Sequence, residues 1–365
     1  MARAACPHPR LRMAKALKQA RRHAQSVLRA SNFQPSLKNI RIMTELNYSL
    51  LKDLYCIFSP SGNERKMRRF IKRHISRNIP DACVRQDQAG NLYVTRGQAD
   101  TYPCLCAHID QVQHVHPKDF TCVESDEVIF GYSHKLRHQC GLGADDKNGV
   151  FIALTCLAQC DTLKCAFFVG EEVGCVGSSQ ADADFFADCR FCLQIDRRGN
   201  SDFVTSIGLS PICSDDFVRA TSCESYGYAP SSGLMTDVEA LRSLGVTASC
   251  ANISCGYYEP HTDCEFTSKA DLEKCYRFVC HIIQSCTDTY PFQDTADDWW
   301  YGSRDTIPSA TAWEYDECID KCAEMLSSDP LLEKQDFLSC VRESFPTLSD
   351  RDIAEAYDIA KSFAV

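Results

Sequence analysis

Apolar segments that alternate with helical patterns are the feature that most constrains the fold of this 365-residue chain. PCLCAHID, LKCAFFVGEE and RFCLQID are short, almost continuous apolar runs, typical of strands that are buried on both faces. Helical patterns alternate with these runs and with the later strand TASCANIS. They lie in NGVFIALTCLAQC, SSQADADFFAD, DVEALRSLG and SKADLEKCYRFVCHIIQSC, the last with Ser268 as its candidate N-cap. This order predicts an α/β fold with three layers, in which helices cover both faces of a mostly parallel central sheet.

Charge divides the chain into three parts. Residues 1–42 hold ten Lys and Arg and no acidic residue, whereas residues 287–365 hold 18 acidic and six basic residues. We therefore predict a basic leader over 1–42, a main domain over 43–286, an acidic linker over 287–312 and a small helical appendage over 313–365. The helical pattern that follows Met43 is a natural beginning for the domain, so we favour Met43 as the first residue of the functional protein. The alternative is that residues 1–42 target the protein to an organelle.

Composition excludes several classes of protein. The net charge of -10 argues against a chain-wide nucleic-acid binder, and no apolar run is long enough for a transmembrane helix. The 24 cysteines often occupy apolar strand positions, and the chain has no secretory signal. We therefore expect reduced, structural thiols, a cytoplasmic location, and no nucleic-acid or membrane partner.

Acidic residues and histidines follow the expected strands, where ligands gather in open α/β sheets. His108 and Asp110 end one strand and share a face, because alternate strand residues point the same way. Taken singly, such residues also fit a solvated turn or, for Asp145 and Asp146, a helix N-cap. Repeated after several strands, they favour a metal site with nitrogen and carboxylate ligands, which suits zinc, or else cobalt or manganese. The segments that carry these residues are AHID, GLGADDKNG, VGEEVG, QIDRRG and EPHTDCE.

In this order the five segments resemble those of the di-zinc exopeptidases, the superfamily of zinc aminopeptidases, peptidase T and glutamyl aminopeptidases. The resemblance spans about residues 43–286 and implies an aminopeptidase that hydrolyses short peptides with two zinc ions. It implies one zinc held by His108, Asp145 and Asp196, and a second held by Asp145, Glu172 and His261. It also implies that Glu171 is the general base, that Asp110 orients His108, and that the Asp145–Asp146 peptide is cis.

Two further residues are candidates for the substrate site. Asp237 follows Thr236 in a segment that resembles a Thr-Asp-Ala element of glutamyl aminopeptidases, and Arg197 directly follows Asp196. Arg197 fits a substrate carboxylate or a structural ion pair equally well. Four other histidines, which we assign to a polar hairpin or flap rather than to the metal site, are His114, His116, His134 and His138.

The spacing of the segments departs from many relatives, which carry an inserted lid domain. Only 37 positions separate His108 from Asp145, and 65 separate Asp196 from His261, so we predict a catalytic domain without a lid. Two alternatives to an aminopeptidase stay open: an amidohydrolase or deacylase of non-peptide substrates, and an inactive metal-binding scaffold or interaction protein. The sequence predicts neither the preferred substrate nor the oligomeric state.

Overall fold

The structure, a computed structural model, describes residues 46–292 apart from residue 209, and parts of residues 318–363. The predicted leader over 1–42 and most of the predicted linker over 287–312 lie outside the described residues. The elements below therefore belong to the α/β domain and to the C-terminal helices.

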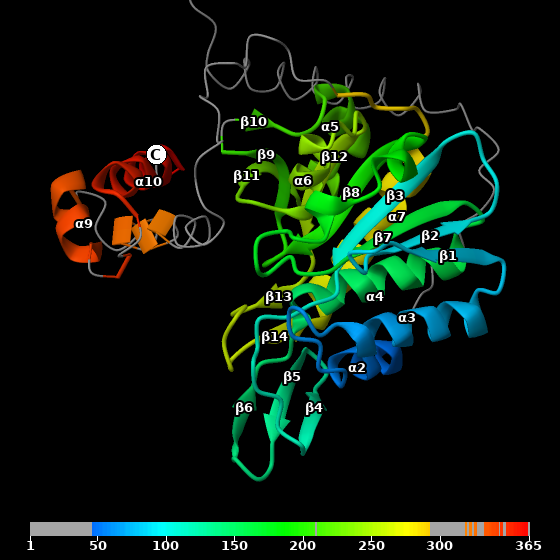
Figure 1. Ribbon diagram of the computed structural model, residues 1–365, viewed down its shortest axis with the longest axis horizontal. Helices are drawn as coiled ribbons and strands as arrows, with labels where there is room; N and C mark the ends of the chain where they lie inside the picture. The colour runs from blue at the N-terminus through cyan, green and yellow to red at the C-terminus, as the bar shows by residue number, and fades with distance from the viewer. Residues whose placement is uncertain are drawn as a thin grey trace, which may run out of the picture. The chain divides into compact units, whose positions relative to one another are not determined.

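The core of the α/β domain is a sheet of nine strands, counted among the described residues. Strands β7, β3, β8 and β12 at its centre run parallel, and antiparallel pairing begins at β2 on one side and at β9 on the other (Figure 1). In spatial order the strands are β1 (Ala82–Gln86), β2 (Leu92–Arg96), β7 (Leu163–Phe168), β3 (Tyr102–His108), β8 (Cys189–Arg197), β12 (Ser249–Ser254), β9 (Asp202–Ile207) and β10 (Ser210–Pro211), with β11 (Ala229–Gly233) also paired to β9.

Helices cover both faces of this sheet, so the predicted three-layer α/β fold is confirmed. One face is covered by α4 (Ala144–Gln159), α5 (Asp215–Thr221) and α7 (Lys269–Ser285). On that face Phe191 stacks on Phe217 of α5, and Phe203 meets Phe278 of α7 edge-on. The opposite face is covered by α6 (Asp237–Ser243) with the 3-10 turns η1 (Ser178–Gln180) and η2 (Ala183–Phe186). Helix α2 (Tyr48–Tyr55) packs on α4, and α3 (Arg65–Asn78) contacts β1.

Cysteines form part of the packed interior. Cys104, Cys192 and Cys250 are register partners on β3, β8 and β12, and they pack with Val238 and Leu241 of α6. Of the 23 cysteines that the structure describes, 18 are buried and all are free thiols. Within the described chain, cysteine therefore serves mainly as a small apolar core residue, as the sequence predicted.

One local expectation was wrong. The segment SSQADADFFAD has a helical pattern, but the structure contains the two separate 3-10 turns η1 and η2 there. Ala181 between them is extended, and the Asp182 carboxylate accepts a hydrogen bond from the Asp184 backbone N–H. This local hydrogen bond starts a new turn and competes with a continuous helix.

A small antiparallel sheet lies beside the central one. It contains the hairpin that was expected between the segments AHID and GLGADDKNG. Its order is β13 (Tyr257–Tyr258), β14 (Phe266–Ser268), β5 (Val128–Ser133) and β4 (Phe120–Glu124), with β6 (His138–Cys140) paired to β5. Strands β13 and β14 flank the turn that holds His261. The small sheet therefore links this turn to the chain between His108 and Asp145.

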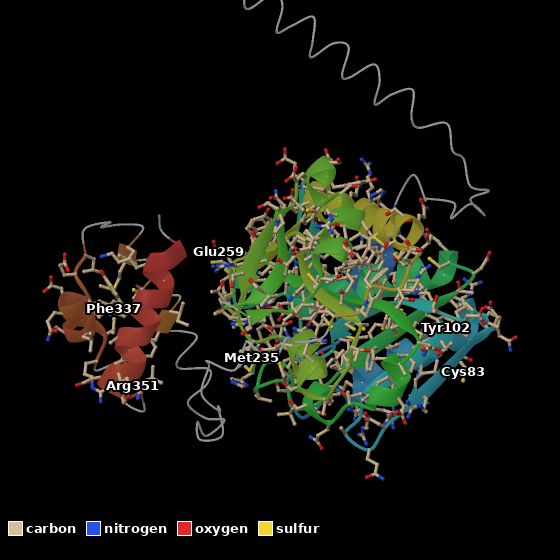
Figure 2. The ribbon with its side chains drawn as sticks, turned by 90° about the horizontal axis from the view of Figure 1, so that it is seen from above. Cys83, Tyr102, Met235, Glu259, Phe337 and Arg351 are labelled. Carbon is tan, nitrogen blue, oxygen red and sulfur yellow. The ribbon has the colours of Figure 1, made fainter. Side chains whose placement is uncertain are left out.

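The C-terminal segment contains the helices α9 (Lys334–Val341) and α10 (Asp350–Phe363), together with helical residues within 318–326. Phe337 and Val341 of α9 pack with Ile353 and Tyr357 of α10 in a hydrophobic cluster (Figure 2, where Phe337 is labelled). The helical character of the predicted appendage is therefore confirmed in the described part of this segment.

None of the helices in the described part of the chain is long and apolar enough to cross a bilayer. The cytoplasmic location of the protein stays a prediction.

The Ser268 side chain caps α7, as the sequence predicted, by accepting a hydrogen bond from the Asp271 backbone N–H. We expect Ser268→Ala to lower the free energy of unfolding by about 1 kcal/mol, because it leaves that donor without its partner. Urea denaturation followed by circular dichroism measures the change. Ser179→Ala, at an exposed serine of η1, is the control; an equal loss in both variants would contradict the capping role.

Candidate metal centre

His108 ends β3 with its imidazole fully buried among carboxylates. Its Nε2 atom lies 3.0 Å from Oδ1 of Asp145 and 3.6 Å from Oδ1 of Asp196, and its Nδ1 atom lies 3.4 Å from Oδ1 of Asp110. Burial lowers the pKa of His108, but these carboxylates outweigh it and raise the pKa well above its usual value.

Asp110 has hydrogen-bond partners in addition to its contact with His108. Its carboxylate accepts hydrogen bonds from the Ser61 hydroxyl, at 2.8 Å, and from the backbone N–H groups of Glu171 and Glu172, at 3.1 and 3.2 Å. One buried carboxylate thus lies against the histidine and fixes the loop that carries both glutamates. The i, i+2 spacing predicted its contact with His108, but nothing local in the sequence indicated Ser61.

Asp145 is the second residue of α4 and faces two different histidines. Its Oδ1 atom lies 3.0 Å from Nε2 of His108, and its Oδ2 atom lies 3.3 Å from Nε2 of His261. The peptide between Asp145 and Asp146 is cis. Asp146 has a different task, since its carboxylate accepts hydrogen bonds from the backbone N–H groups of Gly149 and His108. The two adjacent aspartates therefore differ in role: the Asp145 carboxylate faces the histidines, whereas the Asp146 carboxylate holds the backbone.

Glu265 holds the chain that presents Asp145. Its carboxylate is fully buried and accepts hydrogen bonds from the backbone N–H groups of Gly143, at 2.6 Å, and Asp145, at 3.0 Å. Gln113 Nε2 donates a further bond at 3.3 Å. Burial raises the pKa of Glu265 to about 7. We did not predict this role from the sequence, because nothing in the segment EPHTDCE shows which backbone groups its last residue meets.

Glu171 and Glu172 follow β7 and point to different histidines. Oε2 of Glu172 lies 3.0 Å from Nε2 of His261, whereas Oε2 of Glu171 lies 3.9 Å from Nε2 of His108. Burial and the neighbouring Asp196 raise the pKa of Glu171 well above its usual value. The two adjacent glutamates therefore face different sides of the site, Glu172 toward His261 and Glu171 toward His108. This arrangement is expected for a metal ligand beside a general base.

Asp196 near the end of β8 is held by two amide side chains. Its Oδ2 atom accepts a hydrogen bond from Gln194 Nε2 at 3.0 Å, and its backbone N–H donates to Asn252 Oδ1 at 2.9 Å. Burial and the charge of Asp145 raise the pKa of Asp196 to about 8. We did not predict the contact of Gln194 with Asp196. Its position two residues before Asp196, on the same face of the strand, was a usable signal for that contact.

His261 lies in the turn between β13 and β14, with 52% of its side chain exposed. Although burial lowers its pKa, hydrogen bonds to Asp145 and Glu172 raise the pKa of His261 to about 11. The residue has a positive φ of 63°. It is the most exposed member of the predicted ligand set.

The five predicted ligands form two overlapping groups that share Asp145. Each group offers ligand atoms that lie within 4.8 Å of one another: His108, Asp145 and Asp196 in one, and Asp145, Glu172 and His261 in the other. Oε1 of Glu172 is buried and has no hydrogen-bond partner among the described residues. Crowded buried carboxylates are unfavourable unless cations compensate them, and imidazole with carboxylate suits zinc. The donor set therefore fits a pair of divalent metal ions.

A cavity of about 340 Å³ opens onto these ligands. Arg197, Met235 and Pro260 contribute to its wall (Met235 is labelled in Figure 2). Arg197 pairs with Asp202, with 3.2 Å between Nε and Oδ2. The other substrate-site candidate, Asp237, is fully buried and accepts hydrogen bonds from Ser178 Oγ and Gln194 Nε2. Among the described residues, Asp237 does not line this cavity.

The fold of this site resembles that of solved peptidases, although no family model matches the chain. Aminopeptidase PepT from Bacillus cereus is 15% identical with a TM-score of 0.52, and the alignment covers 66% of this chain and 97% of that one. A tripeptidase from Staphylococcus aureus gives 15% identity, a TM-score of 0.53 and the same coverage. A TET aminopeptidase from a marine sediment thaumarchaeon gives 16% identity and a TM-score of 0.51 over 65% of this chain and 96% of that one.

One curated protein also matches over a short segment. It is a protein of Pyrobaculum aerophilum described as a LysW-lysine/LysW-ornithine hydrolase, 33% identical over 63 residues. The match spans 17% of this chain and only 18% of that protein. At these levels of identity the likeness to the solved structures is one of fold. The resemblance stated from the sequence is confirmed in that respect: the chain has the fold of these aminopeptidases and of the tripeptidase.

Proposed function

We propose that the protein is a metal-dependent aminopeptidase that hydrolyses short peptides. The observation that carries this proposal is the position of the Asp145 carboxylate, whose two oxygens face His108 and His261 separately. A carboxylate placed in this way can bridge two metal ions, an arrangement known in aminopeptidases. His108 and Asp196 would hold one zinc beside Asp145, and Glu172 and His261 would hold the other; cobalt or manganese would suit the same ligands.

Glu171 is the general base in this proposal. When bound, the two ions would supply Lewis-acid activation of a water molecule and of the scissile carbonyl group. Glu171 accepts the proton of the attacking water and passes it to the leaving amine. Its side chain lines the cavity beside the two ligand groups and belongs to neither of them, so it is free to act on a water molecule there.

The positioning residues are Asp110, Gln194 and Asp237. Asp110 orients His108 and holds the backbone of Glu171. Gln194 Nε2 donates to the carboxylates of both Asp196 and Asp237, so Asp237 acts on Asp196 through Gln194. We therefore assign Asp237 to the support of a ligand rather than to substrate contact.

Arg197 and its neighbour Arg198 are the candidates for binding a substrate carboxylate, since both line the cavity. Arg197 shares its charge with Asp202. Among the described residues, no ion pair is found for Arg198, which is exposed. Arg198 is thus the better placed of the two to bind an anionic group of the substrate.

The activity is tested with a panel of short peptides, the same peptides N-acetylated, and N-acyl amino acids. An aminopeptidase releases the first residue of the free peptides and leaves the acetylated ones intact. The short match to a hydrolase of LysW-lysine keeps an amidohydrolase of other substrates as the second candidate. Cleavage of the N-acyl amino acids alone would favour that candidate, and bound metal without any turnover would favour the inactive scaffold.

Glu171→Gln should lower kcat by a factor of about 10² to 10⁴, the usual contribution of a general base, because the amide cannot accept the proton. Metal content measured by elemental analysis should stay near that of the unaltered protein, since Glu171 belongs to neither ligand group. Glu224→Gln, at an exposed glutamate of a 3-10 turn (Cys223–Tyr226), is the control. A fully active, metal-loaded Glu171→Gln protein would refute the assigned role.

Asp145→Asn should lose metal and activity together, because the amide replaces one of the two anionic oxygens shared by the ligand groups. The metal-to-protein ratio should fall well below that of the unaltered protein, and Asp216→Asn, at an exposed aspartate, should leave it unchanged. Retention of two ions per chain in Asp145→Asn would contradict a bridging carboxylate.

Glu265→Gln should weaken metal binding without removing a ligand. Its amide would present N–H groups to backbone donors, and hydrogen bonds to charged groups contribute about 1.5–3 kcal/mol. We expect roughly a tenfold or greater rise in the metal Kd, equivalent to about 1.4 kcal/mol. Competition with a chromogenic chelator measures it. An unchanged Kd in a folded Glu265→Gln protein would show that Asp145 does not depend on this support.

A further inference from the structure

Two thiols meet where α2 contacts β4, away from the metal ligands. Cys56, the exposed C-cap residue, directly follows α2, and Cys122 lies half-buried in β4. The backbone N–H of Cys56 and the Sγ of Cys122 both donate to the Lys52 carbonyl oxygen, at 3.1 and 3.8 Å. A salt bridge of 2.6 Å between Lys52 Nζ and Glu124 Oε2 joins the same two elements. The two cysteines, 66 positions apart, are thus held side by side.

We propose that Cys56 and Cys122 are a modification site, at which exchange with a low-molecular-weight disulfide forms a reversible disulfide between α2 and β4. The inference does not depend on the proposed peptidase activity. It rests on the contact of the two thiols, on the exposure of Cys56 and on the attachment of the following loop to the metal centre.

The chemistry of the pair gives each cysteine a distinct role. The Cys122 side chain hydrogen-bonds Cys56 and lowers the pKa of Cys56 to about 7, while the same contact raises the pKa of Cys122. A lowered pKa increases the fraction of Cys56 that is thiolate, the form that attacks disulfides. An accessible thiol of lowered pKa beside a second thiol is the arrangement of redox-sensitive cysteines.

The exchange proceeds in two balanced steps. The Cys56 thiolate attacks one sulfur of the small disulfide RSSR, forming a mixed disulfide and releasing RS⁻. The Cys122 sulfur, once deprotonated, attacks the Cys56 sulfur, forms the Cys56–Cys122 bond and releases a second RS⁻. The two protein thiols are oxidised, RSSR is reduced to two RSH, and the two thiol protons end on the released thiols.

The cross-link would reach the metal centre through the loop that follows Cys56. In this loop Ser61 Oγ donates to Asp110 Oδ2 at 2.8 Å, and the Ser59 backbone N–H donates to Gln111 Oε1 at 3.3 Å. Asp110 in turn lies against His108. Fixing Cys56 to β4 therefore restrains the start of a segment whose other end orients a predicted ligand.

The test treats the reduced, metal-loaded protein with oxidised glutathione at pH 7 and follows intact mass and proteolytic peptides. We expect a loss of two hydrogen atoms and a cross-linked peptide that joins Cys56 to Cys122. Cys122→Ser should instead stop at one glutathione on Cys56, and Cys56→Ser should leave Cys122 unmodified. Cys83→Ser, at an exposed cysteine of β1 labelled in Figure 2, should form the disulfide like the unaltered protein.

Two outcomes would overturn the proposal: formation of the two-hydrogen-loss species in Cys56→Ser at an unchanged rate, or glutathione on Cys56 of the unaltered protein that is never displaced by Cys122. Hydrogen exchange gives a second measurement that needs no substrate. Amides of residues 57–63 should exchange at least severalfold more slowly in the oxidised protein, and this slowing should be absent from Cys122→Ser. Equal exchange in both forms would show that the disulfide does not restrain the loop.

Discussion

The contact of Asp145 with two histidines is the interaction on which the site depends, and most nearby hydrogen bonds serve to hold it. Glu265 fixes the backbone before this carboxylate, and Asp146 fixes the backbone after it. Asp146 also accepts the His108 backbone N–H, so the start of α4 is tied directly to the end of β3. A Cβ at Gly149 would lie 2.4 Å from the Ile195 carbonyl oxygen, so this glycine lets α4 approach β8. Helix, strand and carboxylate are thus positioned together.

Buried negative charge imposes the second constraint. Asp110, Asp145, Asp146 and Asp196 are all buried within the same region. An ionised carboxylate without a partner in a low-dielectric interior is strongly unfavourable, so such groups either gain protons or hold cations. The raised pKa values of Asp196 and Glu171 show the first tendency in the protein alone. Two divalent ions would remove the same repulsion, which links metal binding to the stability of the fold.

The sequence predicted those parts of the site that follow from strand periodicity and chain order. His108, Asp145 and Asp196 each stand near a strand end or a helix start, where local pattern predicts side chains at one edge of the sheet. Their grouping as ligands of one metal came only from the resemblance to the di-zinc exopeptidases. The sequence did not predict Glu265, because the backbone groups that Glu265 accepts from lie 120 or more positions away. For Gln194 the bond to Asp196 over two residues was a usable signal, whereas the bond to Asp237 spans 43 positions. The helix expected in SSQADADFFAD failed for the opposite reason: a hydrogen bond over two residues at Asp182 outweighed the longer pattern. Predictions thus failed where a single contact, local or distant, decided the structure.

The two ligand groups differ in how their residues are held, and this follows from the topology. His108 and Asp196 lie on neighbouring parallel strands and are buried, so the sheet itself sets their separation. His261 lies in a turn, is half-exposed, and has a positive φ, a conformation that L-residues adopt at a cost. Its position depends on the small sheet and on a bond from the Gly141 N–H to the Asp263 carboxylate. The site therefore combines a buried half built on the central sheet with a more exposed half, held by a turn, that borders the cavity.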